Sequence, residues 1–188
     1  MNKSVVLFLF TLCLTSFQAQ GQRYLPKQRG MQLTAGAVNG LNPKEGFCMG
    51  FAFSQYTKRA NRWVFGAEFL ENRHPYKDVH IPQSQFTAEG GHYLKLLSDR
   101  TKTVFLALGG SAMLGYETIN WSAKLLPDGA TLNSRDAVLY GGALTLECEL
   151  YLSDRLVLLA NIRERLLGGS SAGAANTQFS IGLKYIIN

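Results

Sequence analysis

Apolar residues recur at every second position through most of the chain from Gly30 onward, and clusters of Gly, Asn, Asp and Ser interrupt this pattern at intervals. In the segment TQFSIGLKYIIN the apolar face consists of Phe179, Ile181, Leu183, Tyr185 and Ile187. A period of two is typical of β-strands whose two faces meet different surroundings. We distinguish about eight such segments, so the sequence predicts an all-β chain.

One segment, residues 153–169, also fits a helix. Asp154 could cap a helix at its start and Gly168 could end it. As a strand, the same segment would place Arg163 and Arg165 on the face opposite its leucines. Both interpretations remain open from the sequence alone.

The connections between the predicted strands alternate in length. TKRANR, SDRTK and SDR are short, whereas NGLNPKEG, ENRHPYKDVHIPQ, the stretch 121–137 around LPDG, and GGSSAGAAN are longer or richer in glycine. Short turns at one end and long loops at the other are typical of outer-membrane barrels. We therefore expect a single antiparallel up-and-down β-barrel of outer-membrane type. The alternative is a soluble, lipocalin-like periplasmic barrel that binds a small apolar ligand.

The N-terminal residues have the three-part layout of a secretory signal. Lys3 precedes an apolar run from Val5 to Leu14, and a polar stretch follows that ends in the small residues Ala19 and Gly21. The apolar run is shorter than the ~20 residues that a membrane-spanning helix needs. We expect residues 1–21 to be a cleaved signal peptide and residues 22–188 to form the barrel domain. The predicted location is the outer membrane of a Gram-negative bacterium.

The charge of the chain changes this picture little. The formal net charge is +6, and cleavage of the signal would remove only Lys3 among the charged residues. The basic residues are scattered along the sequence, without a stripe of bases interleaved with aromatic residues. Direct binding to nucleic acid is therefore not expected, although a basic protein suits an anionic lipid surface.

If the apolar faces contact lipid, the charged residues of the opposite faces point into the barrel. The interior of an eight-stranded barrel has room only for side chains, so these charges must neutralise one another. Across the turn SDR, Glu147 is expected opposite Asn161 and diagonal to Arg163. The predicted structural ion-pair network comprises Glu68, Glu89, Lys95, Glu117, Glu147, Glu149, Arg163, Arg165 and Lys184.

Candidate chemistry is sparse. His74, Asp78 and His80 share one predicted loop, but solvent-exposed loop histidines explain them adequately, and His92 lies unexplained on an apolar face. No serine-nucleophile motif is present. We expect no catalytic residues, no metal, no cofactor and no small-molecule substrate, and an envelope enzyme acting through paired carboxylates is the rival hypothesis.

Two further predictions follow from the strand faces. Cys48 falls on an inward face and Cys148 on an outward face of a distant strand, so no disulfide between them is expected. Aromatic residues near strand ends are expected to form interfacial girdles. These residues are Tyr24, Tyr56, Trp63, Tyr76, Tyr116, Trp121, Tyr140, Tyr151 and Tyr185.

Several longer phrases carry a family resemblance. They are PYKDVHIP, QFTAEGGHYLKLLSDRTKTVF, GYETINW, LPDGATL, RDAVLYGGALTLECELYLSDR and NIRERL. Through them the chain resembles the TraO proteins of conjugative transposons from Bacteroides and its relatives, from RYLPKQRG to GLKYIIN. The resemblance implies a component of a type IV secretion-like transfer apparatus whose partners are other Tra conjugation proteins. It brings no catalytic residues.

Overall fold

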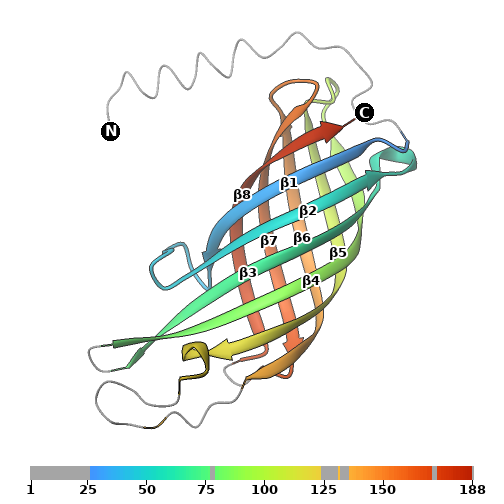
Figure 1. Ribbon diagram of the computed structural model, residues 1–188. Helices are drawn as coiled ribbons and strands as arrows, with labels where there is room; N and C mark the ends of the chain where they lie inside the picture. Colours follow the sequence, from blue (N-terminus) through green and yellow to red (C-terminus); the bar gives the residue numbers. More distant parts are fainter. Residues whose placement is uncertain (1–25, 77–78, 124–130, 132–135, 171–172, 188) are drawn as a thin grey trace, which may run out of the picture.

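The computed structural model describes residues 26–76, 79–123, 131, 136–170 and 173–187. Eight strands form one closed barrel in which each strand pairs with its sequence neighbours and β1 pairs with β8 (Figure 1). The strands are β1 (Arg29–Val38), β2 (Gly46–Tyr56), β3 (Arg62–Tyr76), β4 (Val79–Ser98), β5 (Val104–Ile119), β6 (Ala137–Tyr151), β7 (Leu156–Gly168) and β8 (Ala175–Ile187). This architecture confirms the predicted all-β antiparallel barrel.

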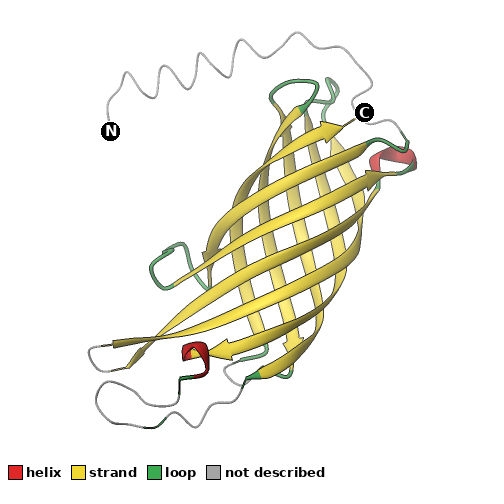
Figure 2. Cartoon of the chain, viewed as in Figure 1, coloured by secondary structure: helices red, strands yellow, loops and turns green. Residues whose placement is uncertain are grey.

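Two short 3₁₀ helices interrupt the connections, η1 (Lys58–Ala60) and η2 (Asn120–Ser122) (Figure 2). No helix in the described ranges has both the length and the apolar character needed to cross a membrane. The helical interpretation of residues 153–169 is wrong, because β7 pairs in register with both β6 and β8. Pairing on both sides satisfies the backbone groups of β7.

The connections lie as predicted, with short turns at the end of the barrel that also carries the described ends of the chain (Figure 1). One predicted loop is wrong. Most of ENRHPYKDVHIPQ is strand, because β3 continues to Tyr76 and β4 begins at Val79. Pro75 and Pro82 are tolerated there because no third described strand pairs with this part of the hairpin, so their missing N–H groups cost no ladder bond.

The wall of the barrel separates two kinds of side chain. Large apolar side chains point outward, and Leu33, Leu166 and Ile181 are 64%, 62% and 69% exposed. Polar and charged side chains point inward, where Glu117 and Lys184 are fully buried. The apolar rows predicted from the period of two therefore lie on the outside.

The cysteines lie on opposite faces, with Cys48 buried inside and Cys148 half-buried on the outer side, and both thiols are free. That the two cysteines form no disulfide with each other stays a prediction. His92, unexplained from the sequence, packs on the outer face against Trp63, with ring centroids 4.7 Å apart.

The aromatic girdle is partly wrong. Trp63, Tyr116, Trp121, Tyr140 and Tyr185 are exposed, as predicted, and Tyr76 is half-buried at the end of β3. Tyr56 and Tyr151 are instead buried inside the barrel, and Tyr24 lies outside the described residues. The two buried tyrosines have partners there. Tyr56 donates a hydrogen bond to Glu149, and Tyr151 packs against the ring of Phe105.

Candidate functional site: the polar interior of the barrel

Four charged residues form a cluster inside the barrel near the short turns, which we call the turn-end cluster. It consists of Arg62 from β3, Glu147 and Glu149 from β6, and Lys184 from β8. Arg62 contacts both carboxylates, at 3.3 Å from Glu149, and Lys184 contacts both, at 3.2 Å from Glu147. Two acids face two bases, so the cluster is neutral although its side chains are almost fully buried.

Two tyrosines complete the turn-end cluster. The hydroxyl of Tyr56 accepts a hydrogen bond from Lys184 at 3.2 Å. The guanidinium of Arg62 lies 4.9 Å from the ring centroid of Tyr93, within the range of a cation–π contact. Aromatic rings thus cover the parts of the cations that the carboxylates do not reach.

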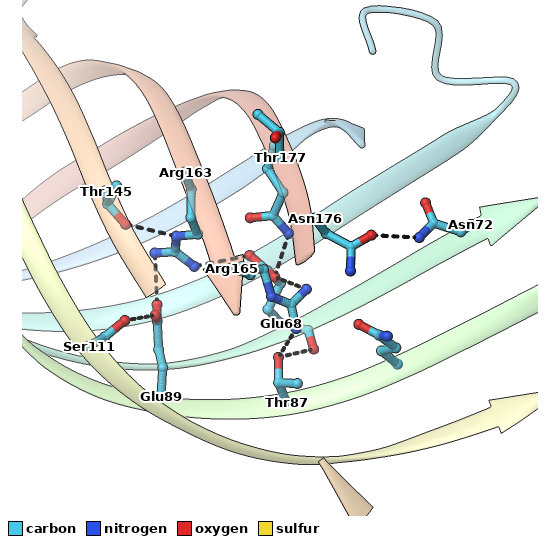
Figure 3. Close-up of polar contacts among 12 residues, drawn as sticks. Glu68, Asn72, Thr87, Glu89, Ser111, Thr145, Arg163, Arg165, Asn176 and Thr177 are labelled. Carbon is cyan, nitrogen blue, oxygen red and sulfur yellow. Dashed lines mark hydrogen bonds and ion pairs between the residues drawn. The ribbon is translucent and has the colours of Figure 1, made fainter. Parts of the chain in front are cut away.

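A second group, the mid-barrel cluster, contains Glu68, Glu89, Arg163 and Arg165 (Figure 3). Arg163 bridges the two carboxylates, with Nη1 at 3.2 Å from Glu68 and Nη2 at 3.1 Å from Glu89. Arg165 lies 2.9 Å from Glu68. Like the turn-end cluster, this group balances two acids with two bases.

Hydroxyl groups fix the geometry of the mid-barrel cluster. Arg163 donates to Thr145 Oγ1 at 3.0 Å, and Ser111 donates to Glu89 at 3.1 Å (Figure 3). Arg163 also donates to the Tyr93 hydroxyl at 3.0 Å. Tyr93 therefore joins the two clusters, because its ring contacts Arg62 and its hydroxyl contacts Arg163. Burying charges costs desolvation, and these ion pairs and hydrogen bonds offset much of it, although Nε of Arg165 has no hydrogen-bond partner among the described residues.

A fifth acid inside the barrel lies toward the long-loop end. Glu117 on β5 accepts hydrogen bonds from the side-chain amides of Gln83 and Gln85, at 2.7 and 2.8 Å, and from the hydroxyl of Ser170 at 2.7 Å. These donors come from β4 and from the connection after β7. Glu117 thus ties the β7–β8 connection to the barrel wall.

Asp136 lies outside the wall at the long-loop end, and its hydrogen bond with Ser122 connects the start of β6 to η2. The pKa of Asp136 lies below its usual value because the hydroxyls of Ser122 and Tyr116 donate hydrogen bonds to its carboxylate, at 2.5 and 2.9 Å. The charged form of Asp136 is therefore favoured.

All nine residues predicted for the lumen lie at inward-facing positions, Lys95 included, since it pairs in register with buried Ala107. Seven of them take part in ion pairs within the two clusters. Lys95 differs, since it is half-buried beside a β-bulge and has no ion pair with any residue the structure describes. Its backbone N–H donates to Asn61 instead.

Sequence reasoning missed two interior residues, Arg62 and Tyr56. Arg62 directly precedes the segment WVFGAEFL, and extending its period of two by one residue would have placed Arg62 inward. Glu147 does lie opposite Asn161 in register, but its ionic partners are Arg62 and Lys184, not Arg163.

The interior has little free space. A cavity of about 20 Å³ lies among Gln32, Glu68, Glu89 and Arg163, room for roughly one water molecule. A small apolar ligand does not fit this lumen in size or in polarity, so the lipocalin-like alternative conflicts with the structure. Within the described ranges no group of three or more His, Cys, Asp and Glu side chains could hold a metal ion.

A closed antiparallel wall with apolar side chains outside and paired charges inside defines a β-barrel of outer-membrane type. Three solved structures share this fold. Neisserial surface protein A is 12% identical, with a TM-score of 0.50 over 84% of this chain and 94% of that one. The N-terminal β-barrel domain of Pseudomonas aeruginosa OprF is 7% identical, with a TM-score of 0.52 over 86% and 98%. Ail, the attachment invasion locus protein of Yersinia pestis, is 10% identical, with a TM-score of 0.53 over 85% and 97%.

The sequence identifies the family. A family model described as conjugative transposon protein TraO matches residues 25–187, which is most of the chain, and the chain therefore belongs to the TraO family. No curated protein matches the sequence. The likeness to the three solved barrels establishes the fold, whereas the family connects the chain to conjugative transfer.

Proposed function

We propose that this TraO protein is a non-enzymatic outer-membrane component of the conjugative transfer apparatus, a type IV secretion-like machine, and that it anchors or positions part of that machine. Residues 1–21 act as a cleaved signal peptide, and residues 22–188 form the barrel. Its partners are outer-membrane lipid and other Tra conjugation proteins, and it uses no cofactor.

The observation that carries this proposal is the apolar outer face of a closed wall. Side chains such as Leu114, Val138 and Ile181 are each more than 60% exposed. Moving one such side chain from water into an apolar medium is favourable by about 1.5–3 kcal/mol. Because the wall is closed, it leaves no strand edge unpaired in the lipid.

The interior clusters have a structural role in this proposal. Their acids and bases balance, and acid/base catalysis would instead need a carboxylate facing a substrate-sized space. The filled lumen also leaves no path for a nucleic acid strand. The protein therefore serves the machine as an anchor and not as the conduit.

The contact with the machine is assigned to the far end of the β3–β4 hairpin. Beyond Asn72 and Gln83, residues 73–76 pair only with residues 79–82 among the described strands (Figure 1). We call these eight residues the ribbon. An isolated two-stranded ribbon is marginally stable in water, so a partner would stabilise it.

The chemistry of the ribbon suits side-chain contacts with a protein. Pro75 and Pro82 lack N–H groups, which disfavours the addition of another strand to its edges. The backbone N–H of Arg73 donates to the carbonyl of Glu45 in the β1–β2 connection at 2.8 Å, and beside this bond a cleft of about 440 Å³ is lined by Glu45, Arg73 and His80. A polar cleft of this size accepts side chains of a partner.

The test replaces residues 74–81 by Asn-Gly, which closes the hairpin with a two-residue turn. The shortened protein should still fractionate with the outer membrane and change its gel mobility on heating, but transfer frequency and copurification of other Tra proteins should fall together. Leu41→Ser in the neighbouring exposed connection is the matched control and should leave both unchanged. Recovery of the wild-type protein in the soluble periplasm would refute the membrane location, and normal copurification with the shortened ribbon would refute its role as the contact.

A further inference from the structure

Basic side chains that are scattered in the sequence gather around one end of the barrel. The end of the wall near the short turns carries Arg29, Lys58, Arg59, Arg100, Lys102 and Arg155, which we call the basic rim. They come from the start of β1 and from all three short turns, so they surround the wall and do not form a patch on one side (Figure 1). All six are exposed.

Among the described residues, the bases of the basic rim have no acidic partner. Two acids share this end, Asp99 and Asp154. The carboxylate of Asp99 accepts hydrogen bonds from the backbone N–H groups of Thr103 and Val104, at 2.7 and 3.0 Å, so it stabilises its own turn.

The other end of the barrel differs. Near the long connections the described charged residues on the outside are Lys44 and Arg73 against Glu45, Glu71, Asp136 and Glu164, and Arg73 pairs with Glu71 at 2.9 Å. The two interior clusters are neutral. The positive net charge of the chain therefore has its main described source in the basic rim.

The basic rim also lies at the border of the exposed apolar side chains on the outer face of the barrel. Arg29 pairs with Gln55, and Gln55 pairs with Trp63, so Arg29 and Trp63 lie roughly 10 Å apart on the same outward row. The next row toward the middle of the barrel contains Met31 and Tyr185, both exposed. Tryptophan and tyrosine at such a border occupy the headgroup level of a membrane, where lipid phosphates lie.

We propose that the basic rim binds anionic phospholipid headgroups, such as phosphatidylglycerol, in the periplasmic leaflet of the outer membrane. The proposal rests on the proposed membrane location. The bases of the rim lie at one depth all around the barrel, which matches a planar layer of lipid phosphates. An acidic protein partner would instead bind bases gathered on one side of the barrel. Each Lys or Arg near an anionic surface strengthens binding roughly fivefold.

The position of the two tryptophans provides the test. Trp63 lies at the basic rim and Trp121 in η2 at the opposite end, and the chain contains two tryptophans. Trp121→Phe leaves a reporter at the rim, and Trp63→Phe leaves a reporter at the other end. Each variant is folded into phosphatidylcholine vesicles that contain a small, equal fraction of brominated phosphatidylglycerol or brominated phosphatidylcholine, and fluorescence quenching is measured.

Trp63 should associate with the phosphatidylglycerol roughly two- to fivefold more strongly than with the phosphatidylcholine. The ratio of Trp63 quenching by brominated phosphatidylglycerol to quenching by brominated phosphatidylcholine should approach one in Lys58→Gln/Arg59→Gln and at high salt. The control variant Lys44→Gln, which removes an exposed base from the opposite end, should keep the preference. Trp121 should show no preference.

Equal quenching of Trp63 by the two brominated lipids would overturn the inference and point to an acidic protein as the ligand of the basic rim, with the membrane location intact. A preference that survives Lys58→Gln/Arg59→Gln would overturn it as well. Absence of quenching of both tryptophans by either lipid would instead refute the membrane location itself.

Discussion

The two faces of β8 carry side chains of opposite character, apolar on the outside and polar or charged on the inside. Ile181 and Tyr185 are 69% and 49% exposed, while Gln178 and Lys184, on alternate positions of the same strand, are buried to 2% and 0%. In a water-soluble protein these classes would exchange places. The difference teaches that stability comes from an apolar medium outside and from charge balance inside, and each side can be disturbed separately.

The largest expected effect is on the inside. Glu147→Gln leaves Arg62 and Lys184 facing Glu149 alone, so one buried positive charge loses its compensation. We expect the free energy of unfolding to fall by about 3–5 kcal/mol. Urea unfolding of the protein in lipid vesicles measures it.

The control for this prediction is Glu164→Gln, since Glu164 is exposed on the outer face and removing its charge should be neutral or stabilising. The double variant Glu147→Gln/Lys184→Met restores the charge balance and should lose less stability than the two single changes together, by at least ~1 kcal/mol. Additive losses would contradict the ionic account of the turn-end cluster.

The next effect is on the outside. Leu183→Arg places a charge on the outer face, in register with Leu33 and Leu158. Such a change costs about 2–4 kcal/mol near the middle of a bilayer. The yield of heat-modifiable protein in the outer membrane should fall, whereas Leu183→Met should assemble normally. Normal assembly of both variants would show that this face does not contact lipid.

A smaller effect concerns the residue that joins the two interior clusters. Tyr93→Phe keeps the ring that covers Arg62 but removes the hydroxyl that accepts a hydrogen bond from Arg163. The expected loss is about 1.5–3 kcal/mol, the range for a hydrogen bond to a charged group. Tyr185→Phe, on the exposed face of β8, is the matched control and should change stability little. Equal losses in the free energy of unfolding for Tyr93→Phe and Tyr185→Phe would contradict the stabilising role of the Tyr93 hydroxyl inside the barrel.

The facing of the strands was predictable because a period of two is a local property of the sequence. Leu146 and Glu147 point to opposite faces whatever the rest of the chain does. The ribbon was not predictable in this way, because its prolines and histidines break the pattern. Only the end of pairing at Asn72 and Gln83 explains why Pro75 and Pro82 are tolerated.

The partners inside the lumen could not be predicted, because contacts across the lumen join strands that are not neighbours. Register correctly placed Glu147 opposite Asn161, yet its ionic partners come from β3 and β8. The basic rim was missed for a related reason. Arg29, Lys58 and Arg155 are far apart in the sequence, and only the alternation of strand direction brings them to one end.

The most direct test of the inside–outside distinction measures accessibility along β8. In a background with Cys48→Ala and Cys148→Ala, single cysteines at Gln178, Ile181, Leu183 and Tyr185 carry a spin label in protein folded into lipid vesicles. Molecular oxygen, which concentrates in lipid, should reach the labels at 181 and 183 far better than a water-soluble nickel complex does. The label at 185, near the headgroup level, should show a smaller difference, and the label at 178 should be shielded from both. Preferential access of the nickel complex to the labels at 181 and 183 would contradict the account, because the apolar face would then meet water.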